Sequence, residues 1–347
     1  MDLLSHKRPQ LRVALNSRCG RACFYCRPSG EAVATHSGVE IAPDDLVFFT
    51  GVAAEFGMRD IKFTGGDPAL YSHLTRVVRE IKQTTAVETI EIISRHPRIG
   101  QLAPQLKAAG ADRFNVSLDT LDRALHKRIC GVDDLDQLIA AVTDLVRTGL
   151  PLKVNMVVMN GINENEIYEL IAFCQKKGVH SLKLLDVIGD LDGSEEFNSR
   201  RLRRQTDATS LAQLYAPLPA VVQSLKDEAV SWEIQHQGDL GHPMTVLTMP
   251  GGLRVIVKDS TEGAWYGNVC TGCKFYPCHD ALMALRLTAD LRAQICLLRE
   301  DIAIDLAPLI RTRNAIMLRN MLSGICRTYD SAKFVSNAAP RATDAVA

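Results

Sequence analysis

The sequence has no excess of charge of either sign, because its 347 residues include 40 Lys and Arg and 40 Asp and Glu. A balanced charge argues against a general binder of nucleic acids, so any phosphate binding must come from a few local basic residues. No run approaches the ~20 consecutive apolar residues that a membrane-spanning helix needs. The N-terminus also lacks a secretory pattern. We therefore expect a protein that neither crosses a membrane nor binds a nucleic acid polymer.

The ten cysteines do not form the framework of a small disulfide-rich protein. They fall into two groups, and three others stand alone at Cys130, Cys174 and Cys326. These three are expected to be ordinary buried thiols. This cysteine usage predicts a reducing compartment, the cytoplasm.

The first group, Cys19, Cys23 and Cys26, has the spacing C-x3-C-x2-C and follows the apolar run Leu11–Leu15. Three thiolates in one loop can each bind one corner of an iron–sulfur cube. A cube has four irons, so three ligands leave one iron open to activate a small molecule. Structural zinc is the alternative, but it needs a fourth ligand, and His36 would give an unusual spacing. The spacing favours an iron–sulfur cluster.

The second group contains Cys270, Cys273, Cys278 and Cys296. Taken alone it slightly favours structural zinc, because four cysteines could close a tetrahedron. Beside the first group, a second iron–sulfur cluster becomes the stronger interpretation. Cys278 could be a fourth ligand, which would make that cluster an electron-transfer or structural one.

Short apolar runs alternate with amphipathic segments up to about residue 186. Strands are predicted at Leu11–Leu15, Asp60–Thr64, Thr89–Ser94, Arg113–Ser117, Leu152–Val158 and Ser181–Asp186. Helices are predicted from Pro43 to Glu55, from Leu135 to Val146, and from Asn163, as an N-cap, to Lys177. This succession implies a parallel sheet with right-handed crossovers. A partial barrel fits, and the pattern alone does not exclude a doubly wound sheet.

In parallel barrels the site lies at the carboxyl ends of the strands. The cysteine loop follows the first predicted strand, and Gly65-Gly66-Asp67-Pro68 follows the second. We therefore expect both motifs to belong to one site.

The pattern changes after about residue 190. Hairpins are predicted from Thr245–Met249 with Arg254–Lys258 and from Ala284–Thr288 with Ala293–Leu297, and Leu306–Leu322 is the last apolar-periodic segment. The basic run Ser199–Gln205 is either a solvated loop or a flap over an anionic ligand. We divide the chain into a barrel (1–190), a C-terminal region with the second cysteine group (191–335) and a tail expected to be disordered (336–347).

These motifs resemble the radical S-adenosylmethionine (SAM) superfamily and, within it, the MoaA family, the GTP 3′,8-cyclases of molybdenum-cofactor biosynthesis. The likeness covers about residues 8–325. It is carried by the first cysteine loop, Cys270, Cys273, Cys296 and the runs Ile61–Pro68, Phe114–Asp122, Lys153–Glu166 and Leu285–Asp290.

The resemblance implies an α/β fold, a partial (β/α)6 TIM-like barrel with a C-terminal α+β extension that carries the second cysteine cluster. It implies two [4Fe–4S] clusters and SAM, which is cleaved by one electron to methionine and a 5′-deoxyadenosyl radical that abstracts a substrate hydrogen. The electron would come from a reductase, a flavodoxin or a ferredoxin.

The resemblance also implies roles for particular residues, but assigns no catalytic side chain. The first cluster would bind Cys19, Cys23 and Cys26, and the second Cys270, Cys273 and Cys296, with Cys278 as an extra ligand. SAM-binding positions would be Tyr25, Thr64, Gly65, Gly66, Asp67, Ser117, Asn155 and Lys183. Substrate-binding positions would be Arg12, Lys62, Lys153 and Arg286.

Several departures from the family pattern fall on the substrate side. Asp60 stands where the family commonly has a phosphate-binding lysine, Ala284 replaces an arginine, an insertion holds Cys278 and His279, and the terminal Gly-Gly is replaced. We therefore expect radical SAM chemistry on a substrate other than GTP: a nucleoside, a sugar derivative or a peptide. The alternatives are a genuine GTP 3′,8-cyclase and a non-enzymatic iron–sulfur or zinc scaffold or sensor.

Overall fold

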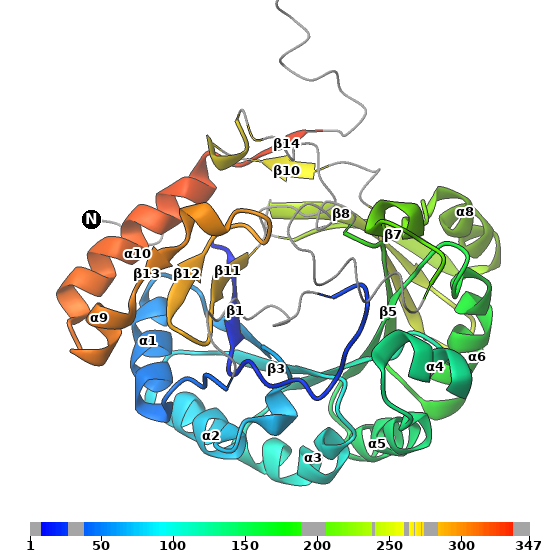
Figure 1. The fold of residues 1–347 in the computed structure, drawn as a ribbon, viewed down its shortest axis with the longest axis horizontal. Helices are drawn as coiled ribbons and strands as arrows, with labels where there is room; N and C mark the ends of the chain where they lie inside the picture. The colour runs from blue at the N-terminus through cyan, green and yellow to red at the C-terminus, as the bar shows by residue number, and fades with distance from the viewer. Residues whose placement is uncertain are drawn as a thin grey trace, which may run out of the picture.

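Six parallel strands lie side by side around a curved sheet in the order in which they occur in the chain (Figure 1). The computed structural model describes residues 8–26, 38–188, 206–237, 240–259, 264–266, 268–271, 273 and 284–335. The six strands are β1 (Gln10–Ala14), β2 (Asp60–Thr64), β3 (Thr89–Ser94), β4 (Arg113–Ser117), β5 (Leu152–Val157) and β6 (Ser181–Leu185). A doubly wound sheet would reverse the strand order midway. The predicted partial barrel is therefore confirmed, and its sheet is not closed.

Helices cover the outer side of this sheet (Figure 1). They are α1 (Pro43–Glu55), α2 (Leu74–Thr84), α3 (Arg98–Ala109), α4 (Arg123–Cys130), α5 (Leu135–Arg147) and α6 (Ile167–Lys177), with the short 3₁₀ turns η1 (Pro68–Leu70) and η2 (Glu164–Glu166). Alternate strand residues such as Leu11, Val13, Ile61 and Phe63 are almost fully buried in the main apolar core. Since strand side chains alternate, the residues between them face the inside of the barrel.

Strands from the C-terminal region extend the same sheet at both edges. β9 (Arg254–Lys258) pairs in parallel with β6, and β11 (Ala284–Leu287) pairs in parallel with β1. Antiparallel partners continue outward: β8 (Leu240–Thr248) and β7 (Ser231–Gln237) beside β9, and β12 (Arg292–Gln294) and β13 (Ile304–Asp305) beside β11. The two predicted hairpins are thus confirmed. The described strands form a 12-stranded sheet and a separate pair, β10 (Ala264–Tyr266) with β14 (Lys333–Val335).

The remaining elements pack around these edges. They are α8 (Pro219–Glu228), α9 (Ala307–Arg311), α10 (Ala315–Asp330) and the turns η4 (Leu211–Leu214), η6 (Asn268–Cys270) and η7 (Glu300–Ile302). The predicted segment Leu306–Leu322 thus spans α9 and the start of α10. Arg319 of α10 forms ion pairs with Glu55 at the end of α1, so the C-terminal helix is held on the first helix.

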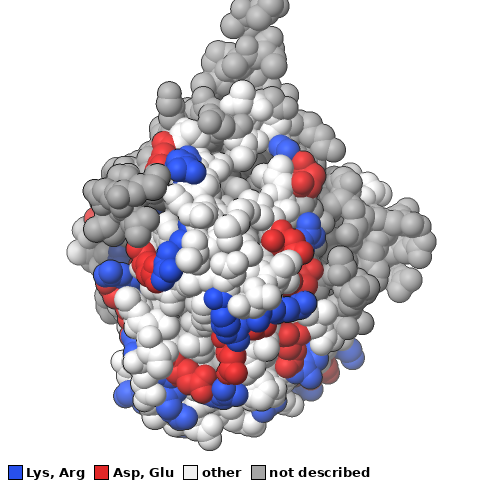
Figure 2. All heavy atoms as spheres, turned by 90° about the vertical axis from the view of Figure 1, so that its left-hand side faces the viewer, with Lys and Arg blue, Asp and Glu red and all other residues white. Residues whose placement is uncertain are grey.

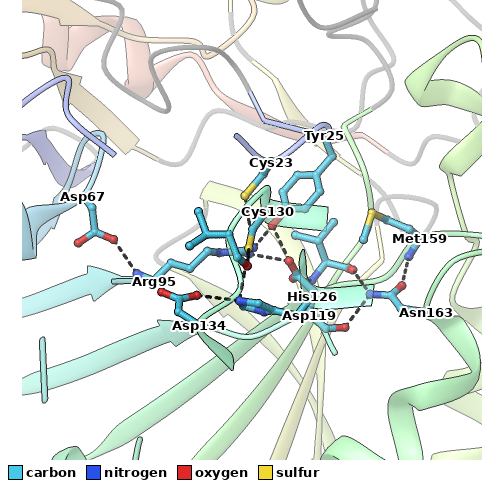
Figure 3. Close-up of polar contacts among 12 residues, drawn as sticks. Cys23, Tyr25, Asp67, Arg95, Asp119, His126, Cys130, Asp134, Met159 and Asn163 are labelled. Atoms are coloured by element: carbon cyan, nitrogen blue, oxygen red, sulfur yellow. Dashed lines mark hydrogen bonds and ion pairs between the residues drawn. The ribbon is translucent and has the colours of Figure 1, made fainter. Parts of the chain in front are cut away.

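Asn163 occupies the N-cap position of η2, which continues directly into α6, as expected, but its side chain makes no capping hydrogen bond. Its carboxamide turns inward instead: Oδ1 accepts a hydrogen bond from Met159 N at 2.7 Å, and Nδ2 donates to the carbonyls of Asp119 and Val157 at 2.8 and 2.9 Å. These bonds tie the end of β5 to the loop after β4 (Figure 3). The helix α6 begins later, at Ile167.

Charged residues of both signs are interspersed on the face that lies at the left of Figure 1, as Figure 2 shows. None of the helices among the described residues combines the length and the apolar character needed to cross a bilayer. His36, Cys278, Ser199–Gln205 and the predicted tail lie outside the described residues.

Candidate functional site

The loop with Cys19, Cys23 and Cys26 leaves the carboxyl end of β1 and is held by its backbone. Ala22 N donates to the carbonyl of Cys130 at 2.8 Å, and Phe24 N donates to that of Ile129 at 3.3 Å. Both acceptors belong to the last turn of α4, whose final carbonyls have no partner within the helix. All nine cysteines within the described residues are free thiols. The helix end therefore fixes the middle of the cysteine loop.

A buried ion pair adds to this attachment. Arg21 contacts the carboxylate of Asp134, and their side chains are 4% and 10% exposed. Asp134 Oδ1 in turn lies 3.1 Å from His126 Nε2, which is 3.3 Å from Cys130 Sγ. Cys130 is buried, as predicted, and it lies beside the cysteine loop (Figure 3).

The glycine pair after β2 is required by contact with this loop. Gly66 N donates to Asn16 O at 2.7 Å, and Asp67 N donates to Arg18 O at 2.6 Å. A Cβ on Gly66 would lie 2.2 Å from the carbonyl of Arg18, and one on Gly65 would lie 2.6 Å from Asn16 O. No side chain fits at either position without moving the backbone. The predicted meeting of the two motifs at one rim is confirmed.

The Asp67 carboxylate is fully used by protein donors. Oδ1 accepts from Ser94 Oγ at 2.6 Å and from Ala69 N at 2.9 Å, and Oδ2 accepts from Arg95 N at 2.8 Å and His96 N at 3.0 Å. Burial raises the pKa of Asp67, and these hydrogen bonds act in the opposite direction. Asp67 therefore ties the glycine turn to the end of β3.

Burial favours the protonated form of two thiols in this loop, Cys19 and Cys23. Burial, with the charges of Asp67 and Cys23, raises the pKa of Cys19 to about 12. Burial also raises the pKa of Cys23, and Arg95 opposes this. Binding of iron requires thiolates, so protons must leave as the metal enters.

The second cysteine group is also brought together from distant segments. Cys270 ends η6, Cys273 N donates to Cys270 O at 3.0 Å, and Cys296 follows β12. The side chain of Arg299 donates to Val269 O at 3.4 Å. Arg299 follows Cys296 by three residues, so the two arms of the group are adjacent. Nearby, Leu298 packs against the apolar cluster that contains Phe24.

Cations gather on the inner face of the barrel around one carboxylate. Lys62 and Lys153 reach Glu91 with Nζ–Oε distances of 3.0 and 2.8 Å, and Asn115 Nδ2 donates to Oε1 at 3.0 Å. Burial opposes ionisation of Glu91, yet the two ammonium groups hold its pKa below its ordinary value. Arg12 lies in register with Lys62, and Arg286 with Arg12, so four predicted substrate positions meet on this face.

Lys183 lies beside these basic residues and reports their combined charge. Burial and the charges of Lys62, Lys153, Lys258 and Arg12 lower its pKa well below the ordinary lysine value. Lys258 Nζ lies 3.9 Å from Asp186 Oδ1. Repulsion from Lys62, Lys153, Lys258 and Arg12 favours the neutral form of Lys183, and an anion entering the barrel would offset this repulsion.

We predict that anion binding on this face weakens as the pH rises above about 8. Burial, together with Lys153 and Arg12, lowers the pKa of Lys62 to about 8 despite Glu91. Below that pH Lys62 is charged and attracts an anion, and above it the charge is lost. Calorimetric titration with sulfate, whose own charge is constant over this range, tests this between pH 7 and 9. The Lys62→Gln variant should bind sulfate more weakly and lose this pH dependence, whereas an unchanged profile would contradict the prediction.

Polar side chains line the carboxyl-end rim above the cations. Thr64 ends β2, Ser117 ends β4, and Asn155 of β5 pairs in register with both Ser117 and Lys183. Asn155 Oδ1 is buried without a hydrogen-bond partner among the described residues. An orphaned buried acceptor is costly unless a ligand satisfies it. This rim is therefore suited to a polar ligand placed beside the cysteine loop.

A family model described as the radical SAM superfamily matches residues 13–174, which hold the cysteine loop, the glycine turn and this rim. A probable GTP 3′,8-cyclase of Pyrococcus abyssi is 30% identical over 85% of this chain and 87% of its own length. A protein of Metallosphaera sedula with the same name is 31% identical over 85% of this chain and 82% of its own length. The chain belongs to the MoaA family of radical SAM enzymes. The alternative of a non-enzymatic scaffold is therefore not retained.

Solved structures share the fold of this MoaA-like enzyme. Streptococcus suis SuiB bound to S-adenosylmethionine is 13% identical with a TM-score of 0.56, covering 91% of this chain and 68% of its own. SuiB bound to its precursor peptide SuiA is 12% identical with a TM-score of 0.54, covering 85% and 61%. At these identities the likeness concerns the fold alone.

A [4Fe–4S] cluster and SAM are the cofactors of this superfamily, and a second cluster is typical of the MoaA family. The chemistry of the residues fits them: three free thiols in one backbone-clamped loop suit the first cluster. The unpartnered Asn155 acceptor suits SAM.

Three charged residues of the site were not predicted from the sequence: Glu91, Arg95 and Asp119. Glu91 interrupts the apolar strand Thr89–Ser94, and such a residue marks a polar inner face. Arg95 and Asp119 each follow a predicted strand end, Ser94 and Ser117, at the rim already identified. All three residues could therefore have been identified as site candidates from their positions relative to the predicted strands.

Proposed function

We propose that this radical SAM enzyme abstracts a hydrogen atom from a small anionic substrate other than GTP. The supporting observation is the inner face, where Lys62 and Lys153 share the one carboxylate of Glu91, and where burial and the charges of Lys62, Lys153, Lys258 and Arg12 lower the pKa of Lys183. A phosphorylated or carboxylated nucleoside, sugar or short peptide fits this charge. A neutral substrate would leave the repulsion among these cations unrelieved.

In this proposal Cys19, Cys23 and Cys26 hold the first cluster, and the rim around Thr64, Gly65, Gly66, Asp67, Ser117, Asn155 and Lys183 holds SAM, with the Tyr25 ring packed beside it. When bound and reduced by one electron, the cluster and SAM supply methionine and a 5′-deoxyadenosyl radical. Arg12, Lys62, Lys153 and Arg286 bind the substrate anion on the inner face. Anchoring that end orients the remainder of the substrate toward the rim and excludes water from the reacting bond.

Two residues support a substrate other than GTP. Ala284 stands where the family carries an arginine; it is fully buried and offers no charge. Asp60 points to the same side of β2 as Lys62 and accepts a hydrogen bond from the Thr89 hydroxyl at the exposed amino end of the strand. Both changes reduce the positive charge available to a triphosphate.

GTP cyclisation is the second candidate, because the curated relatives near 30% identity are named probable GTP 3′,8-cyclases. Anaerobic assays of 5′-deoxyadenosine with GTP, other nucleotides, sugar phosphates and acidic peptides separate the two. We expect stimulation by an anionic compound and none by GTP. A cyclised nucleotide formed from GTP would overturn the proposal, and stimulation by neutral compounds alone would overturn its anionic part.

The electron for SAM cleavage would come from a flavodoxin, a ferredoxin or a dedicated reductase. We place the reaction in a reducing cytoplasm, since the described cysteines are all free and an exposed cluster is oxygen-sensitive.

We further propose that Cys270, Cys273 and Cys296 hold a second [4Fe–4S] cluster and that Cys278 is not a required ligand. The Cys278→Ala variant should then keep its iron content and its rate of SAM cleavage. Iron and sulfide analysis after anaerobic reconstitution checks this, with Cys273→Ala as the matched control that should lose about half the iron, in line with one cluster of two. Equal losses of iron in the Cys278→Ala and Cys273→Ala variants would show that Cys278 is a ligand.

A further inference from the structure

Arg95 follows β3 directly and extends beneath the cysteine loop (Figure 3). Its Nη1 donates a hydrogen bond to Cys23 Sγ at 3.4 Å. Arg95 is 9% exposed and Cys23 is 8% exposed, so bulk water screens this contact little. A permanent positive charge therefore touches the sulfur of one proposed cluster ligand.

The guanidinium is held in this position from several sides. Nη2 donates to Asp119 Oδ2 at 2.6 Å and also to the hydroxyl oxygen of Tyr25, while the Tyr25 hydroxyl donates to Asp119 Oδ2 at 2.8 Å. Asp119 Oδ1 accepts from Val157 N at 3.0 Å, so the carboxylate is itself fixed. Asp67 holds the backbone of Arg95. The donor that faces Cys23 cannot turn away without breaking this network.

A purely structural ion pair is the simpler interpretation, and the same loop provides one for comparison. Arg21 and Asp134 are also buried and also hold the cysteine loop. The side-chain bonds of Arg21 go to Asp134 and to Gly20 O, not to a cysteine sulfur. Arg95 opposes the raised pKa of Cys23 more strongly than Arg21 does. Arg95 thus differs from Arg21 in its direct contact with the ligand sulfur.

We propose that Arg95 is a positioning residue that raises the reduction potential of the cluster held by Cys19, Cys23 and Cys26; this rests on the proposed assignment of that cluster. An external low-potential one-electron donor is oxidised, one ferric iron becomes ferrous, and no proton moves. Reduction increases the negative charge on the ligand sulfurs. An N–H donor with a full positive charge stabilises that reduced state more than the oxidised one. Arg95 therefore makes the electron transfer that precedes SAM cleavage easier.

The test is a potentiometric titration of the reconstituted full-length protein, with dithionite as reductant, following the paramagnetic signal that changes when SAM is added. Arg95→Gln alone would leave Asp119 buried and unpaired, so the variant to use is Arg95→Gln with Asp119→Asn. The matched control is Arg21→Gln with Asp134→Asn, which removes a comparable buried pair. We expect the Arg95 pair to lower the reduction equilibrium constant about tenfold, or ~59 mV for one electron. The Arg21→Gln, Asp134→Asn control should shift the midpoint potential much less.

Equal midpoint potentials in wild type and the Arg95 pair, or equal shifts in both pairs, would overturn the proposal. If the Arg95 pair fails to take up iron, Arg95→Met with Asp119→Leu decides, because it replaces the buried ion pair by apolar side chains and removes the charge beside Cys23. A lowered potential in this variant supports the proposal, and a wild-type potential overturns it. Failure of the site assignment is recognised separately, because wild type would then show no SAM-sensitive signal. The substrate proposal does not enter this measurement.

Discussion

Replacing Cys23 by alanine is expected to abolish SAM cleavage, leaving 5′-deoxyadenosine at the level of a reaction without enzyme. Cys23 is 8% exposed in the middle of the loop, between two backbone hydrogen bonds to α4. The other two cysteines of the loop cannot take over a third corner of the cube. Chromatographic measurement of 5′-deoxyadenosine under anaerobic reducing conditions checks the prediction.

The control for Cys23→Ala is Cys174→Ala. Cys174 is a fully buried thiol in α6, so its loss creates a small cavity without touching the site. Cys174→Ala should lose some stability and retain SAM cleavage. SAM cleavage that persists in Cys23→Ala would refute the assignment of the first cluster.

Replacing Gly66 by alanine is expected to displace the cysteine loop. The new Cβ would lie 2.2 Å from the carbonyl carbon and oxygen of Arg18, and a backbone cannot move aside as a flexible side chain can. Overpacking of this kind typically costs roughly 1–3 kcal/mol, and we expect the upper end or more here. Urea denaturation should show the lost stability, and iron analysis should show poor cluster uptake.

Gly324→Ala in α10 provides the matched control, because beyond the local helix backbone no atom of the described residues lies within 4 Å of its added Cβ. Alanine in a helix interior should stabilise the protein by ~0.5–1 kcal/mol relative to glycine. If Gly66→Ala were as stable and as rich in iron as Gly324→Ala, the close contact between the glycine turn and the cysteine loop would be wrong.

The barrel strands could be predicted from the sequence because apolar and polar residues alternate locally. The boundaries of Asp60–Thr64, Thr89–Ser94 and Arg113–Ser117 agree with the structure. The positions of β9 and β11 could not be predicted in this way. Their pairing with β6 and β1 joins residues far apart in the sequence, and no local periodicity specifies the partner of a strand.

The cysteines could be identified from their spacing, but the structural roles of the residues around them could not be predicted from the sequence. The resemblance gave Gly65 and Gly66 as SAM-binding positions, and the structure shows that their lack of side chains allows the Asn16–Arg18 backbone to approach. Asn163 stands at the N-cap position of η2, but its side chain bonds to Met159, Val157 and the distant Asp119 and makes no capping bond. Such contacts depend on the packed fold and override local preference.

The balanced net charge likewise conceals a strong local imbalance. Equal totals of acidic and basic residues exclude a generally basic surface, and the visible face in Figure 2 agrees. The basic residues that matter are distributed over β1, β2, β5, β6 and β9, one to a strand, and the pairing of these strands in one curved sheet brings them together. Their effect follows from geometry and not from composition.

The most direct test of the radical SAM site is electron paramagnetic resonance of the reduced protein with and without SAM, in a variant that lacks Cys270, Cys273 and Cys296. Only the cluster held by Cys19, Cys23 and Cys26 should then contribute. We predict a [4Fe–4S]⁺ signal that changes on addition of SAM, because one iron is open to the added ligand. A cluster signal that SAM leaves unchanged, or the absence of any cluster, would contradict the site described here.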